Sequence, residues 1–313
     1  FLSLRYLAHL GDEIPVLEHL KTAKASHQQV GPNGLVCPAK GHQPDLIAIQ
    51  AESVSIPSAS FGDKTPPVLK AAFSGPQSNI RPLQVEVFAG GTWVTTAGFL
   101  TGLPISELGW LKPYANFILE DQVSWSLPKY LSECGYHTVY FMPMSYGFLN
   151  EGRFVESLGF ETVVDAAGMN AGSLHEPDQF YYAKALEYIR QHRKEDGRPI
   201  FMTLLTMSAH SPYNYRLAPD EKLEGEPFSK DPVLNEYFRR LKLTRSQLDD
   251  FVGELESGEG SRPGYLLEFG DHQAFLALPH LKKKHGESVL SDPASVAYQT
   301  FYQVVPFGAE LAS

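Results

Sequence analysis

The sequence feature that most constrains the fold is a regular alternation of short apolar runs with longer helical patterns, which begins near His42. This alternation is typical of an α/β protein with a mainly parallel central sheet and helices on both faces. The helix expected over residues 127–134 has the clearest end signals, with Ser126 before it and Gly135 after it. The pattern predicts strands over residues 45–50, 83–88, 137–142, 199–206, 264–269 and 301–307, and helices over residues 92–103, 127–134, 178–192 and 233–255.

The segments between these elements indicate a single compact domain over residues 41–313, preceded by a helix and linker over residues 1–40. Leucines at near-helical spacing between Phe1 and Leu20 predict an amphipathic helix that packs either on the domain or on a membrane surface. The chain starts at Phe1 and contains no run of about 20 apolar residues, so we expect either a cleaved leader or a fragment of a longer protein. Loops are predicted over residues 21–41, 57–80, 211–232 and 273–298.

Charge and cysteine content exclude several classes of protein. There are 26 Lys and Arg residues against 36 Asp and Glu residues, which gives a net charge of -10. Such a chain repels the phosphate backbone of nucleic acid, so nucleic acid is not expected as a partner. Cys37 and Cys134 form no CxxC pattern, which excludes a disulfide scaffold and a four-cysteine zinc site. They either form one disulfide in an oxidising compartment or lie buried as free thiols.

Polar residues follow three of the predicted strands. Glu52 comes after the first strand, Thr92 after the second, and Asp271 with His272 after the strand over residues 264–269. The carboxyl ends of parallel strands meet at one edge of a sheet, so these side chains could share a site for one divalent cation, with Mn or Zn preferred over Ca. Taken singly, each also fits a helix cap or a surface turn.

These residues belong to a longer set of motifs that occur in a fixed order. The ordered set resembles the extracytoplasmic catalytic domain of the lipoteichoic acid synthase and phosphoglycerol transferase group, within the sulfatase and alkaline phosphatase superfamily. The resemblance covers roughly residues 40–275 and implies an alkaline phosphatase-like α/β fold. The motifs are PDLIAIQAES (44–53), GGTWVTTAGFLTGLP (90–104), LPKYLSECGY (127–136), SLGF (157–160), PIFMTLLTMSAHSPY (199–213) and FGDH (269–272).

The resemblance implies roles for individual side chains. Glu52, Asp271 and His272 correspond to metal ligands, and Thr92 to a nucleophile that also binds the metal. His210 corresponds to a histidine that contacts the phosphoryl substrate. Coordination to a dication lowers the pKa of a threonine hydroxyl, so that its alkoxide can attack phosphorus. A helix that starts at this threonine would also direct free N–H groups at the phosphate.

The substrate side of the site departs from the pattern of this group. Glu151 stands where the group has a phosphate-binding Arg, and Arg153 is expected to take over that contact. Thr96 stands where the group usually has Glu, and Gln273 where many superfamily members have Gly. Trp93, next to the nucleophile, is expected to line the substrate cleft. These differences concern the substrate head group and leave the metal ligands and the threonine unchanged.

Other histidines are weaker candidates. His280 and His285 follow the last motif, in a region from which some superfamily members take a further metal ligand. The three lysines beside them favour a solvated turn instead. We interpret the remaining histidines outside the motifs as surface or packing residues, namely His27, His42, His137, His175 and His192.

The resemblance implies a phosphotransferase that uses one divalent ion, Mn or Zn. Thr92 would attack a phospholipid donor, form a covalent phospho-Thr and pass a phosphoglycerol- or phosphoethanolamine-type group to a glycan or other cell-envelope acceptor. Such enzymes are membrane-anchored and extracytoplasmic, acting in the periplasm or on the outer face of the cytoplasmic membrane. The alternatives are a hydrolase of the phosphodiesterase or sulfatase kind, and a non-catalytic glycan- or lipid-binding relative with a vestigial metal site. A sulfatase is disfavoured, because neither Cys37 nor Thr92 lies in a Cys/Ser-x-Pro-x-Arg motif.

Overall fold

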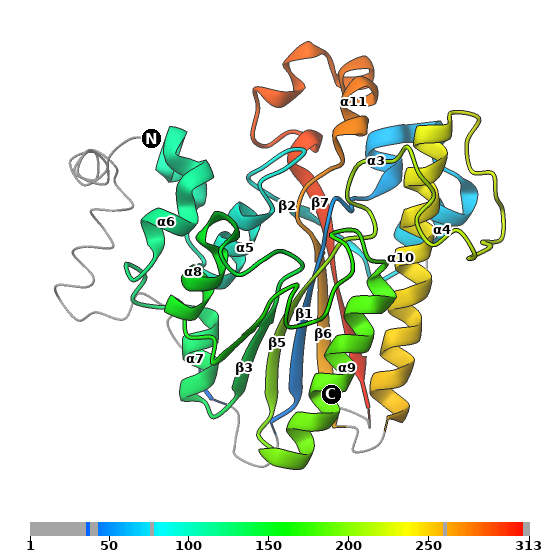
Figure 1. The fold of residues 1–313 in the computed structure, drawn as a ribbon. Helices are drawn as coiled ribbons and strands as arrows, with labels where there is room; N and C mark the ends of the chain where they lie inside the picture. Colours follow the sequence, from blue (N-terminus) through cyan, green and yellow to red (C-terminus); the bar gives the residue numbers. More distant parts are fainter. Residues whose placement is uncertain (1–35, 38–42, 76–77, 259–261, 309–313) are drawn as a thin grey trace.

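The centre of the molecule is a seven-stranded sheet with the strand order β2-β7-β6-β1-β5-β3-β4 (Figure 1). The computed structural model describes residues 36–37, 43–75, 78–258 and 262–308. Neighbouring strands from β6 to β4 pair in parallel, whereas β7 is antiparallel to β6 and β2 is antiparallel to β7. The expectation of a mainly parallel sheet is confirmed, with two antiparallel strands at one edge. The strands are β1 (Asp45–Ala51), β2 (Arg81–Gln84), β3 (His137–Phe141), β4 (Thr162–Val164), β5 (Ile200–Thr206), β6 (Gly264–Gly270) and β7 (Gln299–Phe307).

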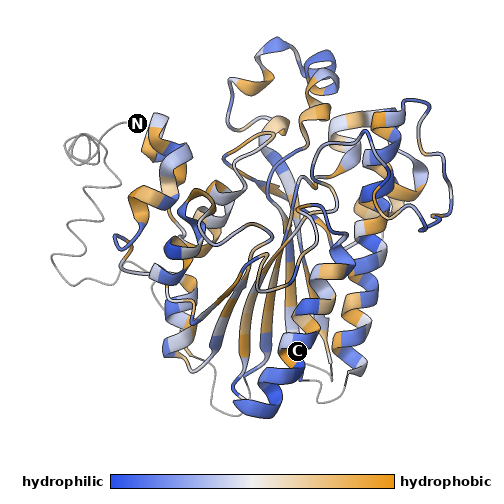
Figure 2. Ribbon diagram, viewed as in Figure 1, coloured by the Kyte–Doolittle hydropathy of each residue, from blue (hydrophilic) through white to orange (hydrophobic). Residues whose placement is uncertain are grey.

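Helices cover both faces of the sheet, as the alternating pattern predicted (Figure 1). Side chains of β1 alternate between the two layers: Ile47 and Ile49 pack with α9 and α10, and Ala48 packs with α5, α7 and α8. Figure 2 shows the apolar residues gathered on the strands and on the helix surfaces that face them. The α-helices are α3 (Pro57–Phe61), α4 (Pro67–Ser74), α5 (Thr92–Thr101), α6 (Ala115–Leu119), α7 (Leu127–Glu133), α8 (Glu151–Ser157), α9 (Asp178–Glu195), α10 (Pro232–Ser257) and α11 (Leu278–His285). The 3-10 helices are η2 (Gly62–Lys64), η3 (Ile105–Tyr114), η4 (Phe148–Asn150), η5 (Phe275–Ala277), η6 (Glu287–Leu290) and η7 (Val296–Tyr298).

Two of the predicted loop segments were assigned wrongly. Residues 57–80 contain α3 and α4, and residues 273–298 contain α11 with several 3-10 helices. These helices have at most eight residues, and a segment of two turns or less shows too little of the helical period to be detected. The second strand is also shorter than predicted, because the chain leaves the sheet at Gln84 rather than Phe88.

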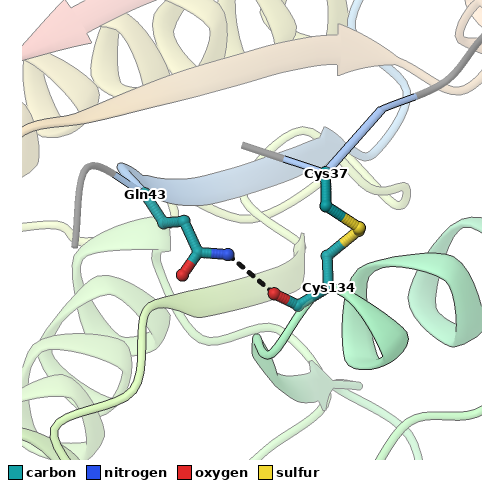
Figure 3. The surroundings of a disulfide bond; sticks show 3 residues. All are labelled: Cys37, Gln43 and Cys134. Carbon is teal, nitrogen blue, oxygen red and sulfur yellow. Dashed lines mark hydrogen bonds between the residues drawn. A yellow bond between two sulfur atoms is a disulfide. The ribbon is translucent and has the colours of Figure 1, made fainter. Parts of the chain in front are cut away.

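The two cysteines form a disulfide that joins the segment before β1 to the end of α7 (Figure 3). The Cα atoms of Cys37 and Cys134 lie 5.3 Å apart, and the Gln43 side chain donates a hydrogen bond to the Cys134 carbonyl at 2.6 Å. The disulfide alternative is therefore confirmed, and the free-thiol alternative is wrong. The bridge closes a loop of 97 residues that contains β1 and α5.

The amphipathic helix expected between Phe1 and Leu20 lies outside the described residues, so it stays a prediction. Within the described ranges, no helix combines the length and apolar character that a membrane span requires.

Candidate active site

Three side chains of the expected site come together at the carboxyl edge of the sheet. Glu52 follows β1, Asp271 and His272 follow β6, and these two parallel strands are neighbours with Ala51 opposite Gly270. One ligand atom from each of Glu52, Asp271 and His272 lies within 4.8 Å of the others. All three side chains are buried, so the cluster is screened from bulk water.

Thr92 reaches the same cluster from the first residue of α5. Its hydroxyl donates a hydrogen bond to Glu52 Oε2 at 2.8 Å and lies 3.4 Å from His272 Nε2. We expected Thr92 to follow a strand of the parallel sheet. Instead, the preceding strand is the antiparallel edge strand β2, and a loop connects it to the start of α5 at Thr92. The four side chains that we expected to share a site therefore lie side by side.

The backbone before Thr92 depends on glycine. Gly90 and Gly91 have φ angles of 142° and 87°, a region that other L-residues rarely adopt. Gly91 occupies the N-cap position of α5, where no side chain accepts a hydrogen bond from the first turn. Free N–H groups at this helix end favour an anion beside Thr92.

The backbone after Thr92 is fixed from the sheet. Gln50 Nε2 donates to the Thr92 carbonyl at 3.1 Å, and Thr96 Oγ1 is within 3.1 Å of the same carbonyl. Thr96 also donates to Gln50 Oε1 at 3.0 Å. The residue that departs from the family pattern at position 96 therefore helps to hold the nucleophile candidate in place.

Ser53 orients both carboxylates of the cluster. Its N–H donates to Asp271 Oδ1 at 2.8 Å, and its hydroxyl donates to Glu52 Oε1 at 2.8 Å. This geometry uses a left-handed backbone at Ser53, with a φ of 57°, and Tyr237 from α10 donates to the Ser53 carbonyl at 2.9 Å. The sequence predicts no role for Ser53, because in sequence it resembles an ordinary loop serine. Its positive φ distinguishes it only in the structure.

The donor atoms of the cluster fit a divalent cation. His272 Nδ1 lies 3.1 Å from the Gln273 carbonyl, which can only accept, so the ring proton belongs on Nδ1 and the Nε2 lone pair faces inward. Nε2 lies 3.4 Å from Glu52 Oε1 and 3.3 Å from Asp271 Oδ2. Asp271 Oδ2 is buried and has no hydrogen-bond partner among the described residues. An imidazole lone pair and an unpartnered carboxylate oxygen that converge on one point are a donor set that suits a divalent cation.

The electrostatics of the cluster agree with this fit. Burial, followed by the nearby Glu52 carboxylate, raises the pKa of Asp271 well above its ordinary value. Two carboxylates this close repel each other when both are ionised, and a dication between them relieves the repulsion.

The cluster opens into a cavity of about 270 Å³. His210, four residues beyond β5, lies on its wall together with Thr92 and Trp93. Arg240 from α10 holds the His210 segment, because its guanidinium donates to the His210 carbonyl at 2.7 Å and to the Tyr215 carbonyl at 3.1 Å. The cavity is lined by Glu52, Ser53, Ala89, Gly90, Gly91, Thr92, Trp93, Pro143, Met144, Phe148, Glu151, Leu205, Met207, His210, Ser211, Tyr213, His272 and Phe275.

Glu151 belongs to this cavity, whereas Arg153 does not. Glu151 is the first residue of α8, is 4% exposed and lines the cavity. Burial, and to a smaller extent the charge of Glu52, raises the pKa of Glu151 to about 7, although a hydrogen bond from Tyr140 opposes the shift. Arg153 lies two positions further on, about 200° around the helix, and is exposed. The expectation that Arg153 contacts the phosphate therefore stays a prediction, and Glu151 rather than Arg153 lines the described cavity.

Other histidines have packing roles. The His280 ring packs against Phe61 with centroids 5.2 Å apart and is not among the residues lining the cavity. His137, His192 and Asp196 form a second group of potential metal ligands. However, both ring nitrogens of His137 are within hydrogen-bond distance of other side chains, Nδ1 of Glu161 and Nε2 of Tyr188. His192 Nε2 lies 3.0 Å from the Arg198 carbonyl. This second group therefore offers no converging free lone pairs.

Several solved structures share the fold of this chain. The lipoteichoic acid synthase LtaP from Listeria monocytogenes is 18% identical, with a TM-score of 0.66 over 95% of this chain and 72% of that chain. Streptococcus pyogenes phosphoglycerol transferase GacH, in complex with sn-glycerol-1-phosphate, is 20% identical, with a TM-score of 0.62 over 97% and 75% of the two chains. The C-terminal periplasmic domain of EcEptC from Escherichia coli, in complex with Zn, is 16% identical, with a TM-score of 0.54 over 83% and 72%.

Sequence comparisons assign the chain to a family. An uncharacterized protein of Haemophilus influenzae is 25% identical over 263 residues, which is 78% of this chain. The chain spans 47% of the length of that relative. The family model described as Sulfatase matches residues 44–292, most of the sequence and all of the clustered side chains. The chain is therefore a member of the sulfatase family, within the sulfatase and alkaline phosphatase superfamily.

Proposed function

We propose that this chain is the catalytic domain, over residues 41–313, of a metal-dependent phosphotransferase that uses Thr92 as its nucleophile. The observation that carries the proposal is the contact of the Thr92 hydroxyl with the Glu52, Asp271 and His272 cluster at the start of α5. Superfamily members use divalent metals, and a neighbour of similar fold is a Zn complex. A formylglycine sulfatase is not proposed, because the nucleophile position holds Thr rather than Cys or Ser.

The metal site that we propose consists of Glu52, Asp271, His272 and Thr92. Bound there, one Mn or Zn ion would act as a Lewis acid that favours the alkoxide form of the threonine. Ser53 keeps both carboxylates in position, and the Gln273 carbonyl keeps the His272 lone pair directed inward.

The transfer reaction has two steps. In the first step, the Thr92 oxygen forms a bond to the donor phosphorus, and the bond from phosphorus to the diacylglycerol oxygen breaks, with that oxygen taking up a proton. In the second step, the oxygen of an acceptor hydroxyl forms the new phosphorus–oxygen bond, the bond from phosphorus to the Thr92 oxygen breaks, and the acceptor's proton replaces the one that Thr92 gave up in the first step. The N–H groups at the start of α5 and the His210 imidazole stabilise charge on the phosphoryl oxygens.

The partners follow from the same proposal. We propose a phospholipid donor and a hydroxyl acceptor on a glycan or another cell-envelope component. The names of the neighbours support this assignment, since they include a lipoteichoic acid synthase and a phosphoglycerol transferase. An extracytoplasmic location, in the periplasm or on the outer face of the cytoplasmic membrane, agrees with the disulfide between Cys37 and Cys134. Anchoring by a membrane segment outside this sequence is part of the proposal.

The experiment that tests the proposal replaces the nucleophile. Thr92→Ala should reduce transfer from a fluorescent phospholipid by at least about a thousandfold, because the attacking oxygen is gone. Thr92→Ser should retain part of the activity, since only the methyl group is lost. Thr101→Ala, the same substitution at the far end of α5, serves as the matched control.

Mass spectrometry completes this test. Wild type incubated with donor and without acceptor should carry a phosphoryl adduct on the peptide containing Thr92, and Thr92→Ala should not. Thr92→Ala should still bind metal through its three remaining ligands. Turnover at the wild-type rate in Thr92→Ala, without an adduct in either protein, would instead indicate attack by a metal-activated water, as in a phosphodiesterase.

A further inference from the structure

One wall of the cavity holds a carboxylate without a cationic partner. Glu151 lines the cavity and is 4% exposed, and the hydrogen bond that the described residues give its side chain comes from the neutral Tyr140 hydroxyl at 2.6 Å. Among the described residues that line the cavity there is no Lys or Arg. A buried carboxylate is normally paired with a cation or kept neutral. Glu151 is therefore an acidic group of the cavity wall to which the described residues supply no cation.

Aromatic rings surround the same cavity. Trp93, Phe148, Tyr213 and Phe275 all contribute to its lining. Trp93 is held in place by a hydrogen bond from its Nε1 to the Pro113 carbonyl at 3.0 Å, and Tyr213 by one from its hydroxyl to the Ala209 carbonyl at 2.7 Å. The polar atom of Trp93 is thus already used, which leaves its π-system for a ligand, whereas the Tyr213 ring already has the Arg240 guanidinium 5.2 Å from its centroid. Aromatic walls combined with a carboxylate are a common recognition site for an ammonium group.

We propose that Glu151 and the aromatic residues of this cavity form a subsite for a positively charged amine on the transferred head group. The inference rests on the proposed function and specifies its substrate class: a phosphoester whose head group carries an ammonium, such as phosphoethanolamine, in preference to neutral phosphoglycerol. The phosphoryl group faces Thr92 and the α5 amino terminus, and the ammonium faces Glu151. The Tyr140 hydroxyl orients the carboxylate toward this role.

The size of the cavity and the charge of Glu151 together determine which head group we expect to bind. Its volume of about 270 Å³ suits a small phosphoester head group, while acyl chains must lie outside. An ammonium forms a charge-assisted hydrogen bond with Glu151, whereas a glycerol hydroxyl forms a neutral-donor bond that is weaker. Glu151→Gln keeps the shape and the oxygen that accepts from Tyr140 but removes the charge, so it isolates this effect.

The test compares O-phosphoethanolamine with sn-glycerol-1-phosphate in calorimetric titrations of the Mn- or Zn-loaded protein. We expect wild type to bind O-phosphoethanolamine at least about tenfold more tightly, as a charge-assisted bond implies. Glu151→Gln should reduce that preference at least about tenfold and leave the affinity for sn-glycerol-1-phosphate nearly unchanged. The matched control is Glu156→Gln, which removes a charge from the exposed side of the same helix and should behave as wild type.

Several results would overturn the subsite. Equal affinities in wild type, a preference for sn-glycerol-1-phosphate, no binding of either compound, or a preference that survives in Glu151→Gln would each contradict it. In turnover assays with phosphatidylethanolamine and phosphatidylglycerol, the substitution should raise KM for the amine donor selectively. An equal fall in kcat for both donors would assign Glu151 to proton transfer instead.

The outcome can be separated from that of the proposed function. A Thr92 adduct from phosphatidylglycerol that is insensitive to Glu151→Gln would support the transferase and refute the subsite. Selective binding of O-phosphoethanolamine that depends on Glu151, without any Thr92 adduct, would support the subsite and refute the transferase.

Discussion

Replacing Glu151 with Gln should stabilise the metal-free protein at alkaline pH much more than at acidic pH. The buried carboxyl has its pKa raised from 4.5 to about 7, so between these pH values the folded protein keeps a proton that the unfolded chain releases. Stability falls with rising pH wherever the folded state binds more protons than the unfolded state. One pKa unit corresponds to about 1.36 kcal/mol. The ionised Glu151 therefore lowers the free energy of unfolding by about 3 kcal/mol above this range.

Urea unfolding in the presence of a chelator measures this effect. Tryptophan fluorescence gives the free energy of unfolding of wild type and Glu151→Gln at about pH 5 and about pH 8.5. The difference between the two proteins should grow by about 2 to 3 kcal/mol from the lower to the higher pH, because glutamine does not titrate and its oxygen still accepts from Tyr140. Glu156→Gln, on the exposed side of α8, should show no such growth.

A difference that stays constant with pH would refute the reasoning, since it would mean that the fold does not hold the Glu151 carboxyl protonated. Added Mn or Zn provides a second check. Because the charge of Glu52 contributes to the raised pKa of Glu151, a dication bound to Glu52 should reduce the pH-dependent gain of the variant.

Two further predictions concern the supports of the site. Replacing Cys37 and Cys134 together with Ser should lower the free energy of unfolding by about 4 kcal/mol in urea titrations, as expected for a bridge that closes a loop of this length; an unchanged midpoint would show that the bridge does not form in solution. Arg240→Lys should reduce kcat/KM for transfer by about 10- to 100-fold while metal affinity stays the same. A single ammonium cannot reproduce both carbonyl contacts of the guanidinium, so the His210 segment should shift; unchanged kinetics would refute this positioning role.

The central sheet and the metal-ligand candidates could be predicted from the sequence because short-range signals determine them. Fully buried strands such as β1 and β5 appear as continuous apolar runs. Once these strands are parallel, the residues after them must meet at one edge, and this places Glu52 beside Asp271 and His272. The prediction that Thr92 joins this group depended on the ordered motifs, because β2, the strand that precedes Thr92, lies at the antiparallel edge of the sheet.

Other features depend on contacts between distant segments and could not be read locally. Glu151 resembles any charged residue at the start of a helix, and its burial and its hydrogen bond from the Tyr140 hydroxyl, which comes from β3, depend on the tertiary fold. Arg153 is only two residues from Glu151 in sequence and was expected to take over the phosphate contact, but helix geometry turns the two side chains in different directions. Similarly, the pairing of Cys37 with Cys134 depends on α7 packing near the start of β1, which no spacing rule specifies.

The proposed metal ion and the proposed head-group ammonium would have the same electrostatic role in this cavity. Glu52, Asp271 and Glu151 are all buried, and Glu52 and Glu151 line the cavity proposed for the anionic phosphoryl group, so their ionised forms oppose its binding. A dication held by Glu52, Asp271 and His272 would balance the charges of the two carboxylates. Glu151 comes from a different element, α8, and is not within that group of candidate ligands, so a bound metal would leave it without a cationic partner among the described residues. An ammonium on the head group would balance it, and metal loading and amine recognition would then be successive parts of the same charge compensation.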